Sequence, residues 1–138
     1  MMPRILVALD GSLDSEKALD AAVKVAQQDG GLVTAVAVLE QTGNPRLDQL
    51  PGDAKTQARS HLDELLQAAA RFATSRGVRL TPMLREGHPA DTIIACAEEE
   101  KSNLLVLGAG GEPGGKTCLG DTADQVSNHS PCTVLIVR

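Results

Sequence analysis

The chain has 138 residues, of which 42% are apolar and 22% charged, and its formal net charge is −5. This length suits one domain with a hydrophobic core, and the negative charge argues against binding to nucleic acid or to an anionic membrane, because both require a basic face. Phe72 is the only aromatic residue, which excludes stacking of single-stranded bases on aromatic side chains.

Segments of two kinds alternate along the chain. Short apolar runs bounded by turn residues predict strands over residues 4–9, 32–39, 78–84, 104–107 and 133–137. Longer segments with apolar residues at helical spacing predict helices over residues 14–28, 54–76, 89–100 and 121–129. The polar segment 40–53 contains glycine, asparagine and two prolines, which predicts a loop.

Individual residues indicate how these elements end and pack. Asp14 is the predicted N-cap of the first helix, and Gly30 ends that helix. Pro89 suits the first position of the third helix, and Pro82, which has no N–H group, places the third strand at an edge of the sheet. The predicted apolar face of the longest helix comprises Ala58, Leu62, Leu65, Ala69 and Phe72.

The alternation of strands and helices predicts an α/β fold with a parallel sheet covered by helices on both faces. Right-handed crossovers then limit the topology to the doubly wound family. Ligands of such sheets bind beyond the carboxyl ends of the strands, where the strand order reverses. Asp10 and Gly108 both follow strand ends, so we expect them to converge if the first and fourth strands are neighbours.

A glycine-rich segment follows the fourth predicted strand, with six glycines from Gly108 to Gly120. Glycine lets the backbone approach a phosphate closely, and the N-terminus of the next helix favours negative charge. A loop without a ligand is the alternative. Gly110 to Thr117 also matches the P-loop spacing, with Lys116 before Thr117, which would indicate a small ATPase or kinase. We interpret this match as coincidental, because P-loops follow the first strand of a longer domain.

Four segments in order resemble the universal stress protein family, and the resemblance covers essentially the whole chain. These segments are Ile5-Leu-Val-Ala-Leu-Asp-Gly-Ser12, Gly87-His-Pro-Ala90, Leu104-Leu-Val-Leu-Gly108 and His129-Ser-Pro-Cys-Thr-Val-Leu-Ile-Val137. The resemblance implies a single domain over residues 1–138. It also implies a five-stranded parallel sheet of order 3-2-1-4-5, a Rossmann-like fold similar to the adenine nucleotide alpha hydrolases.

The same resemblance implies a stress-response regulatory protein that binds ATP or AMP. Asp10 would hydrogen-bond the nucleoside, and Val38 would lie against the adenine. Gly108 and Gly111 would contact the ribose and the phosphates. The complete implied site comprises Ala8, Asp10, Val38, Leu107, Gly108, Gly110, Gly111, Lys116, Gly120, Asp121 and Thr122.

Two features depart from the nucleotide-binding members of the family. Eight residues separate Gly111 from Gly120, one fewer than in those members, and Asp121 stands where they have a hydroxyl residue. The Asp121 carboxylate and a ligand phosphate about 4 Å apart would repel each other by roughly 4 kcal/mol at an effective dielectric near 20. Asp121 is predicted to be an N-cap, although Lys116, Thr122 or a bridging Mg²⁺ ion could restore phosphate binding. A member that has lost nucleotide binding and acts through protein–protein interactions is the alternative.

The sequence shows no set of residues expected for turnover. His61, His88 and His129 have no metal-ligand spacing, and no Ser-His-Asp or Cys-His arrangement is evident, so no metal site is expected. We therefore expect a binding protein rather than an enzyme, with very slow ATP hydrolysis at most.

The last predicted strand, residues 133–137, would expose an apolar edge if nothing covered it. The family resemblance implies that this strand pairs with its twin in a homodimer. The other expected partners are the adenine nucleotide and an unidentified protein. Neither a signal peptide nor a membrane-spanning run is evident, which predicts a cytoplasmic protein.

Overall fold

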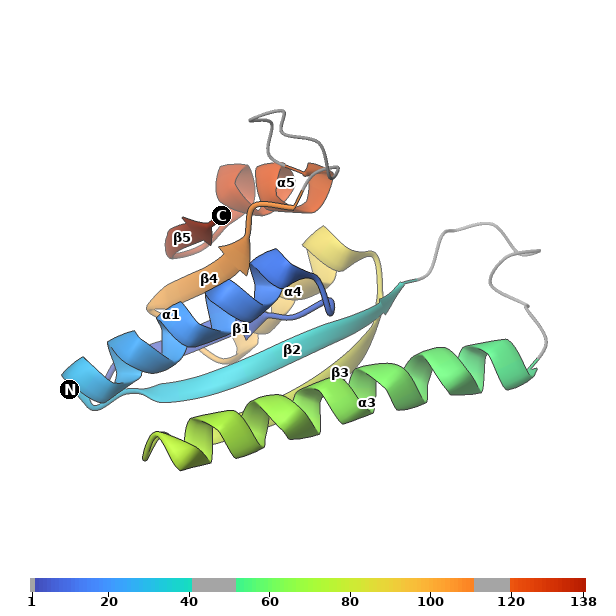
Figure 1. Cartoon of the computed structure of the whole chain (residues 1–138). Coiled ribbons are helices and arrows are strands. Elements are labelled where there is room, and N and C mark those ends of the chain that lie inside the picture. The colour runs from blue at the N-terminus through green and yellow to red at the C-terminus, as the bar shows by residue number, and fades with distance from the viewer. Residues whose placement is uncertain (1, 41–51, 111–119) are drawn as a thin grey trace.

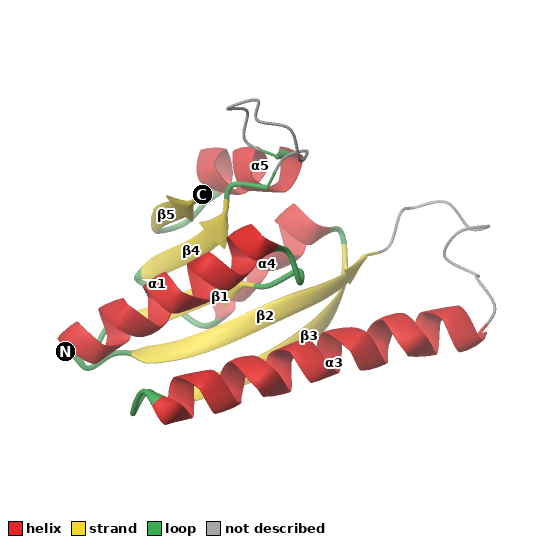
Figure 2. Ribbon diagram, in the orientation of Figure 1, coloured by secondary structure: helices red, strands yellow, loops and turns green. Residues whose placement is uncertain are grey.

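Strands and helices alternate in the computed structural model, which describes residues 2–40, 52–110 and 120–138 (Figure 2). The strands are β1 (Arg4–Ala8), β2 (Leu32–Glu40), β3 (Leu80–Gly87), β4 (Leu104–Gly108) and β5 (Thr133–Val137). The helices are α1 (Leu13–Asp29), α3 (Gly52–Ser75), α4 (Pro89–Glu99) and α5 (Asp121–His129).

The five strands form one parallel sheet of order β3-β2-β1-β4-β5, which confirms the predicted fold class. Strand β1 lies at the centre, where Val7 pairs with Ala35 of β2 on one side and with Val106 of β4 on the other. The strand order therefore reverses between β1 and β4, which makes their carboxyl ends the expected ligand site. Pro82 lies in the edge strand β3, as predicted.

Helices cover both faces of the sheet, with α1 and α3 on one face and α4 and α5 on the other (Figure 1). Successive residues of β1 point to opposite faces, because side chains alternate along a strand. Ile5 and Val7 pack into the core beneath α1 and α3, whereas Leu6 packs beneath α4 and α5. All three are buried, which explains why this strand is apolar without interruption.

The first helix begins one residue earlier than predicted, and the prediction of Asp14 as its N-cap is wrong. Ser12 is the N-cap, and its side-chain oxygen accepts a hydrogen bond from the Ser15 N–H at 3.2 Å. Asp14 lies within the first turn, where its negative charge suits the helix dipole. Gly30 ends the helix as predicted, in the left-handed conformation with φ of 72°.

The buried side of α3 differs in part from the prediction. Leu66, Ala69 and Ala73 are buried, whereas Ala58 is exposed. Figure 1 shows that the first turns of α3 reach beyond the carboxyl end of β2. There the helix contacts the sheet through charged side chains, since Lys55 and Arg59 pair with Glu86 near the end of β3. Strand β3 begins at Leu80 rather than Val78, because the Val78 N–H group donates to the Ala73 carbonyl and so belongs to the end of the helix.

A pocket at the carboxyl ends of the central strands

A pocket of about 330 Å³ lies where the strand order reverses. It is bounded by the carboxyl ends of β1, β2 and β4 and by the first residues of α1, α4 and α5. Its size falls at the lower end of the range for small-molecule sites. The pocket is lined by Ala8, Leu9, Asp10, Ser12, Ser15, Val36, Val38, Glu40, Pro89, Ile93, Leu107, Gly108, Gly110, Gly120, Asp121, Thr122 and Ala123.

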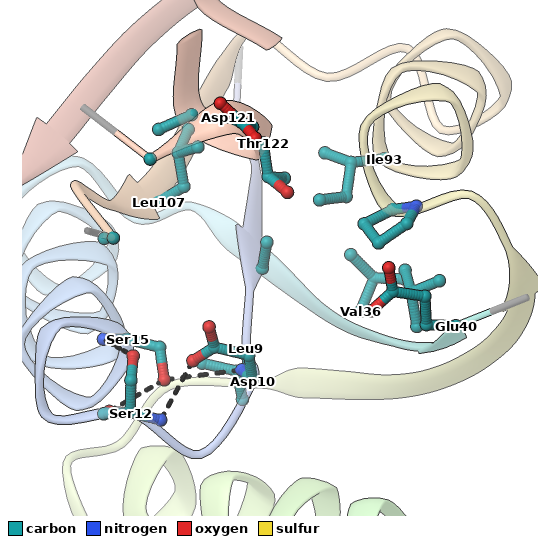
Figure 3. Close-up of a pocket in the computed structure, with 17 residues that line it drawn as sticks. Leu9, Asp10, Ser12, Ser15, Val36, Glu40, Ile93, Leu107, Asp121 and Thr122 are labelled. Carbon is teal, nitrogen blue, oxygen red and sulfur yellow. Dashed lines mark hydrogen bonds between the residues drawn. The ribbon is translucent and has the colours of Figure 1, made fainter. Parts of the chain in front are cut away.

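Aliphatic side chains form the walls of this pocket. Val36 and Leu107 come from the sheet face beneath α4 and α5, and Ile93 comes from α4. In Figure 3 these three side chains surround the centre of the pocket. Ala8 and Val38 complete the strand side and are half-buried. Such walls accept a flat apolar ring between methyl groups, without aromatic stacking.

At one end of the pocket, the Asp10 carboxylate is held by the N-terminus of α1 (Figure 3). The Ser12 N–H group donates to Asp10 Oδ1 at 2.9 Å, and the Asp10 N–H group donates to Ser15 Oγ at 3.4 Å. Burial alone raises the pKa of Asp10, but the hydrogen bonds from Ser12 and Ser15 outweigh it, so the pKa lies below the ordinary value of 3.8. Asp10 is therefore an ionised acceptor at neutral pH, oriented by its neighbours.

Gly108, at the end of β4, lines the pocket and also lets α1 approach the sheet closely. A Cβ atom on Gly108 would lie 2.7 Å from Asp14 Cβ and 2.8 Å from the Asp14 carbonyl carbon. A side chain at this position would therefore collide with the first turn of α1, so glycine is required here for packing.

At the opposite end, Gly110 and Gly120 lie beside each other on either side of residues 111–119. The Gly120 N–H group donates to the Ala109 carbonyl at 2.8 Å, and Gly110 has a φ of 66°, which favours glycine. The prediction of Asp121 as an N-cap is wrong: the N-cap of α5 is Gly120, which has no side chain to accept a capping hydrogen bond. Because the N-cap is glycine, the first amides of α5 can donate hydrogen bonds to a ligand in the pocket.

The structure brings together every predicted site residue that it describes. Gly111 and Lys116 lie outside the described residues, as does Thr117 of the P-loop interpretation. The predicted residues that line the pocket are Ala8, Asp10, Val38, Leu107, Gly108, Gly110, Gly120, Asp121 and Thr122.

Sequence reasoning missed other residues of the pocket. Val36 lies two residues before Val38 on the same face of β2, so the strand period could have identified it. Ile93 lies within the predicted third helix, where nothing in the sequence marks it as a pocket residue, and Glu40 falls in the segment predicted to be a loop. No sequence pattern indicated Pro89 or Ala123, because their positions depend on how α4 and α5 pack.

Asp10, Glu40 and Asp121 are the only charged residues among those described as lining the pocket. In the described ranges, no cluster of three or more His, Cys, Asp or Glu residues is arranged to hold a metal ion. Among the helices described, none is both long and apolar enough to cross a bilayer.

The topology and this pocket define a doubly wound α/β domain with a ligand-sized cavity at its switch point. The sequence model of the universal stress protein family matches residues 1–138, and the chain belongs to that family. The universal stress protein YxiE of Bacillus subtilis is 32% identical over 148 aligned positions, and the alignment covers 100% of both chains.

Solved structures of the same family share the fold. Universal stress protein UspA from Lactobacillus plantarum superposes with a TM-score of 0.88 at 27% identity, covering 99% of this chain and 97% of that one. A universal stress protein in complex with cAMP has a TM-score of 0.77 at 24% identity, covering 99% and 97%. The Archaeoglobus fulgidus protein in complex with dAMP has a TM-score of 0.72 at 22% identity, covering 100% and 98%. The last two proteins are less than 25% identical to this chain, so their likeness establishes the shared fold alone.

Proposed function

We propose that this protein binds an adenine nucleotide or its nucleoside in the pocket between β1 and β4, and acts as a ligand-responsive cytoplasmic regulator rather than an enzyme. The observation that carries the proposal is the order of groups along the pocket. An ionised carboxylate lies at one end, aliphatic walls lie in the middle, and the N-terminus of α5, whose N-cap is a glycine, lies at the other.

The aliphatic walls suit the base. Val36, Val38 and Ile93 provide methyl groups on the side of the sheet that α4 covers, so a purine ring can lie against them and exclude water. The fixed Asp10 carboxylate then accepts a hydrogen bond from a hydroxyl or amino group of the nucleoside. A charge-assisted bond of this kind contributes about 1.5–3 kcal/mol.

The α5 end suits the 5′ group of the ligand. The first amides of α5 and the half-buried Thr122 hydroxyl face this end and can donate hydrogen bonds to it. The Asp121 carboxylate at the same end repels phosphates, so AMP or adenosine fits better than ATP. The solved proteins in complex with cAMP and dAMP, which share this fold, support the choice of an adenine ligand.

Titration calorimetry with adenosine and AMP tests this proposal. We expect saturable binding of both, and about tenfold weaker binding in Asp10→Asn, which corresponds to about 1.4 kcal/mol. Asp14→Asn is the matched control, because it also removes one negative charge, from the first turn of α1, and Asp14 does not line the pocket. Absence of binding of either ligand at millimolar concentration would favour the alternative, a family member that acts only through protein partners.

We also propose that β5 pairs with the β5 strand of a second copy. This strand is an edge of the sheet, and its Leu135 side chain is 39% exposed. An apolar edge strand with free backbone groups readily adds another strand. Light scattering at micromolar concentration should therefore report a dimer, and a monomer under those conditions would contradict the pairing.

A further inference from the structure

The described lining of the pocket carries three carboxylates and no basic side chain. They come from three different elements, since Asp10 follows β1, Glu40 ends β2 and Asp121 begins α5. Figure 3 shows them on different sides of the pocket. The described lining therefore contributes negative potential from several directions, with no positive side chain among the described residues to offset it.

We propose that the pocket selects among adenine ligands by the charge of their 5′ group, and that it prefers a neutral or cationic 5′ group to a phosphate. This inference rests on the proposed function for adenine binding and adds the class of ligand. Asp121 is the specificity-determining residue, because it occupies the α5 end of the pocket together with the helix amides that would otherwise attract an anion.

The balance of charge at the start of α5 supports this assignment. The N-terminus of a helix carries the equivalent of roughly +0.5 elementary charge. Asp121 places a full negative charge on the first residue of that helix, and Asp124 adds another in the same turn. The helix therefore presents a net negative end. The amides can still donate hydrogen bonds to a hydroxyl group, but the negative potential of the helix end disfavours a phosphate.

Calorimetry with four related ligands, in buffer of low ionic strength without divalent ions, tests this inference. The ligands are 5′-amino-5′-deoxyadenosine, adenosine, AMP and ATP, whose 5′ groups range from an ammonium to a triphosphate. We expect affinity to fall in that order. In Asp121→Asn, the ratio of the ATP to the adenosine dissociation constant should fall about tenfold. Added salt should also reduce this ratio, because Asp121 is exposed to solvent.

Asp124→Asn is the matched control. This substitution removes the charge of the other acidic residue in the first turn of α5, which does not line the pocket. The ratio of the ATP to the adenosine dissociation constant should therefore change much less than in Asp121→Asn. If ATP binds the unmodified protein at least as tightly as adenosine, or if Asp121→Asn leaves the ratio unchanged, selection by charge is overturned while adenine binding stands. If none of the four ligands binds, the proposed function fails as well.

Discussion

Replacing Gly108 with alanine is expected to lower the free energy of unfolding by about 3 kcal/mol, at the upper end of the usual effect of overpacking. The added Cβ atom would lie 2.7 Å from Asp14 Cβ, 2.8 Å from the Asp14 carbonyl carbon and 3.0 Å from the Ser15 nitrogen. Two of these atoms belong to the backbone of α1, so no rotation of a side chain can relieve the contact. The helix must move away from β4.

Urea denaturation of Gly108→Ala measures this effect, and Gly30→Ala is the control. Gly30 has a φ of 72° but no atom within 4 Å of an added Cβ, so its substitution adds only conformational strain, about 1–2 kcal/mol. We expect Gly108→Ala to be the less stable variant. It should also bind ligand more weakly, because Asp10 and Ser12 are attached to the end of α1 that moves. If Gly108→Ala has the stability of the unmodified protein, the close packing of α1 on β4 is contradicted.

Replacing Ala8 with phenylalanine is expected to abolish adenosine and AMP binding while leaving the fold intact. Ala8 ends β1 and lines the pocket from the sheet side. Ala8 is only half-buried, so a phenyl ring at this position has the 330 Å³ pocket to enter. The substitution should therefore occupy the place of the base without the strain of overpacking.

Calorimetry and urea denaturation together distinguish this outcome from general damage. Ala58→Phe is the matched control, since Ala58 is exposed on α3, away from the pocket. We expect Ala58→Phe to bind normally and both variants to unfold near the midpoint of the unmodified protein. Normal binding by a folded Ala8→Phe protein would show that the ligand binds elsewhere.

The alternation of apolar strands and helices predicted a parallel sheet, whereas its strand order was implied only by the family resemblance. The convergence of Asp10 and Gly108 depended on β1 and β4 being neighbours, and the structure shows that they are and places both residues around one pocket. Helix ends were less predictable. Asp14 and Asp121 are good N-cap residues, but Ser12 and Gly120 precede them and take the extended conformation that a cap requires.

The missed residues of the pocket depend on tertiary packing. Ile93 is buried, and only the packing of α4 against the sheet places it beside Val36 and Leu107. Glu40 was assigned to a loop, because its polar side chain ends the apolar run of β2. The third carboxylate of the pocket, that of Glu40, therefore became evident only in the structure.

A crystal structure of the protein soaked with adenosine tests the central claim most directly. We expect the adenine to lie against Val38 and Ile93, with a hydroxyl or amino group of the nucleoside hydrogen-bonded to Asp10. An empty pocket in crystals that hold saturating ligand, or adenosine bound at another surface, would contradict the proposed site.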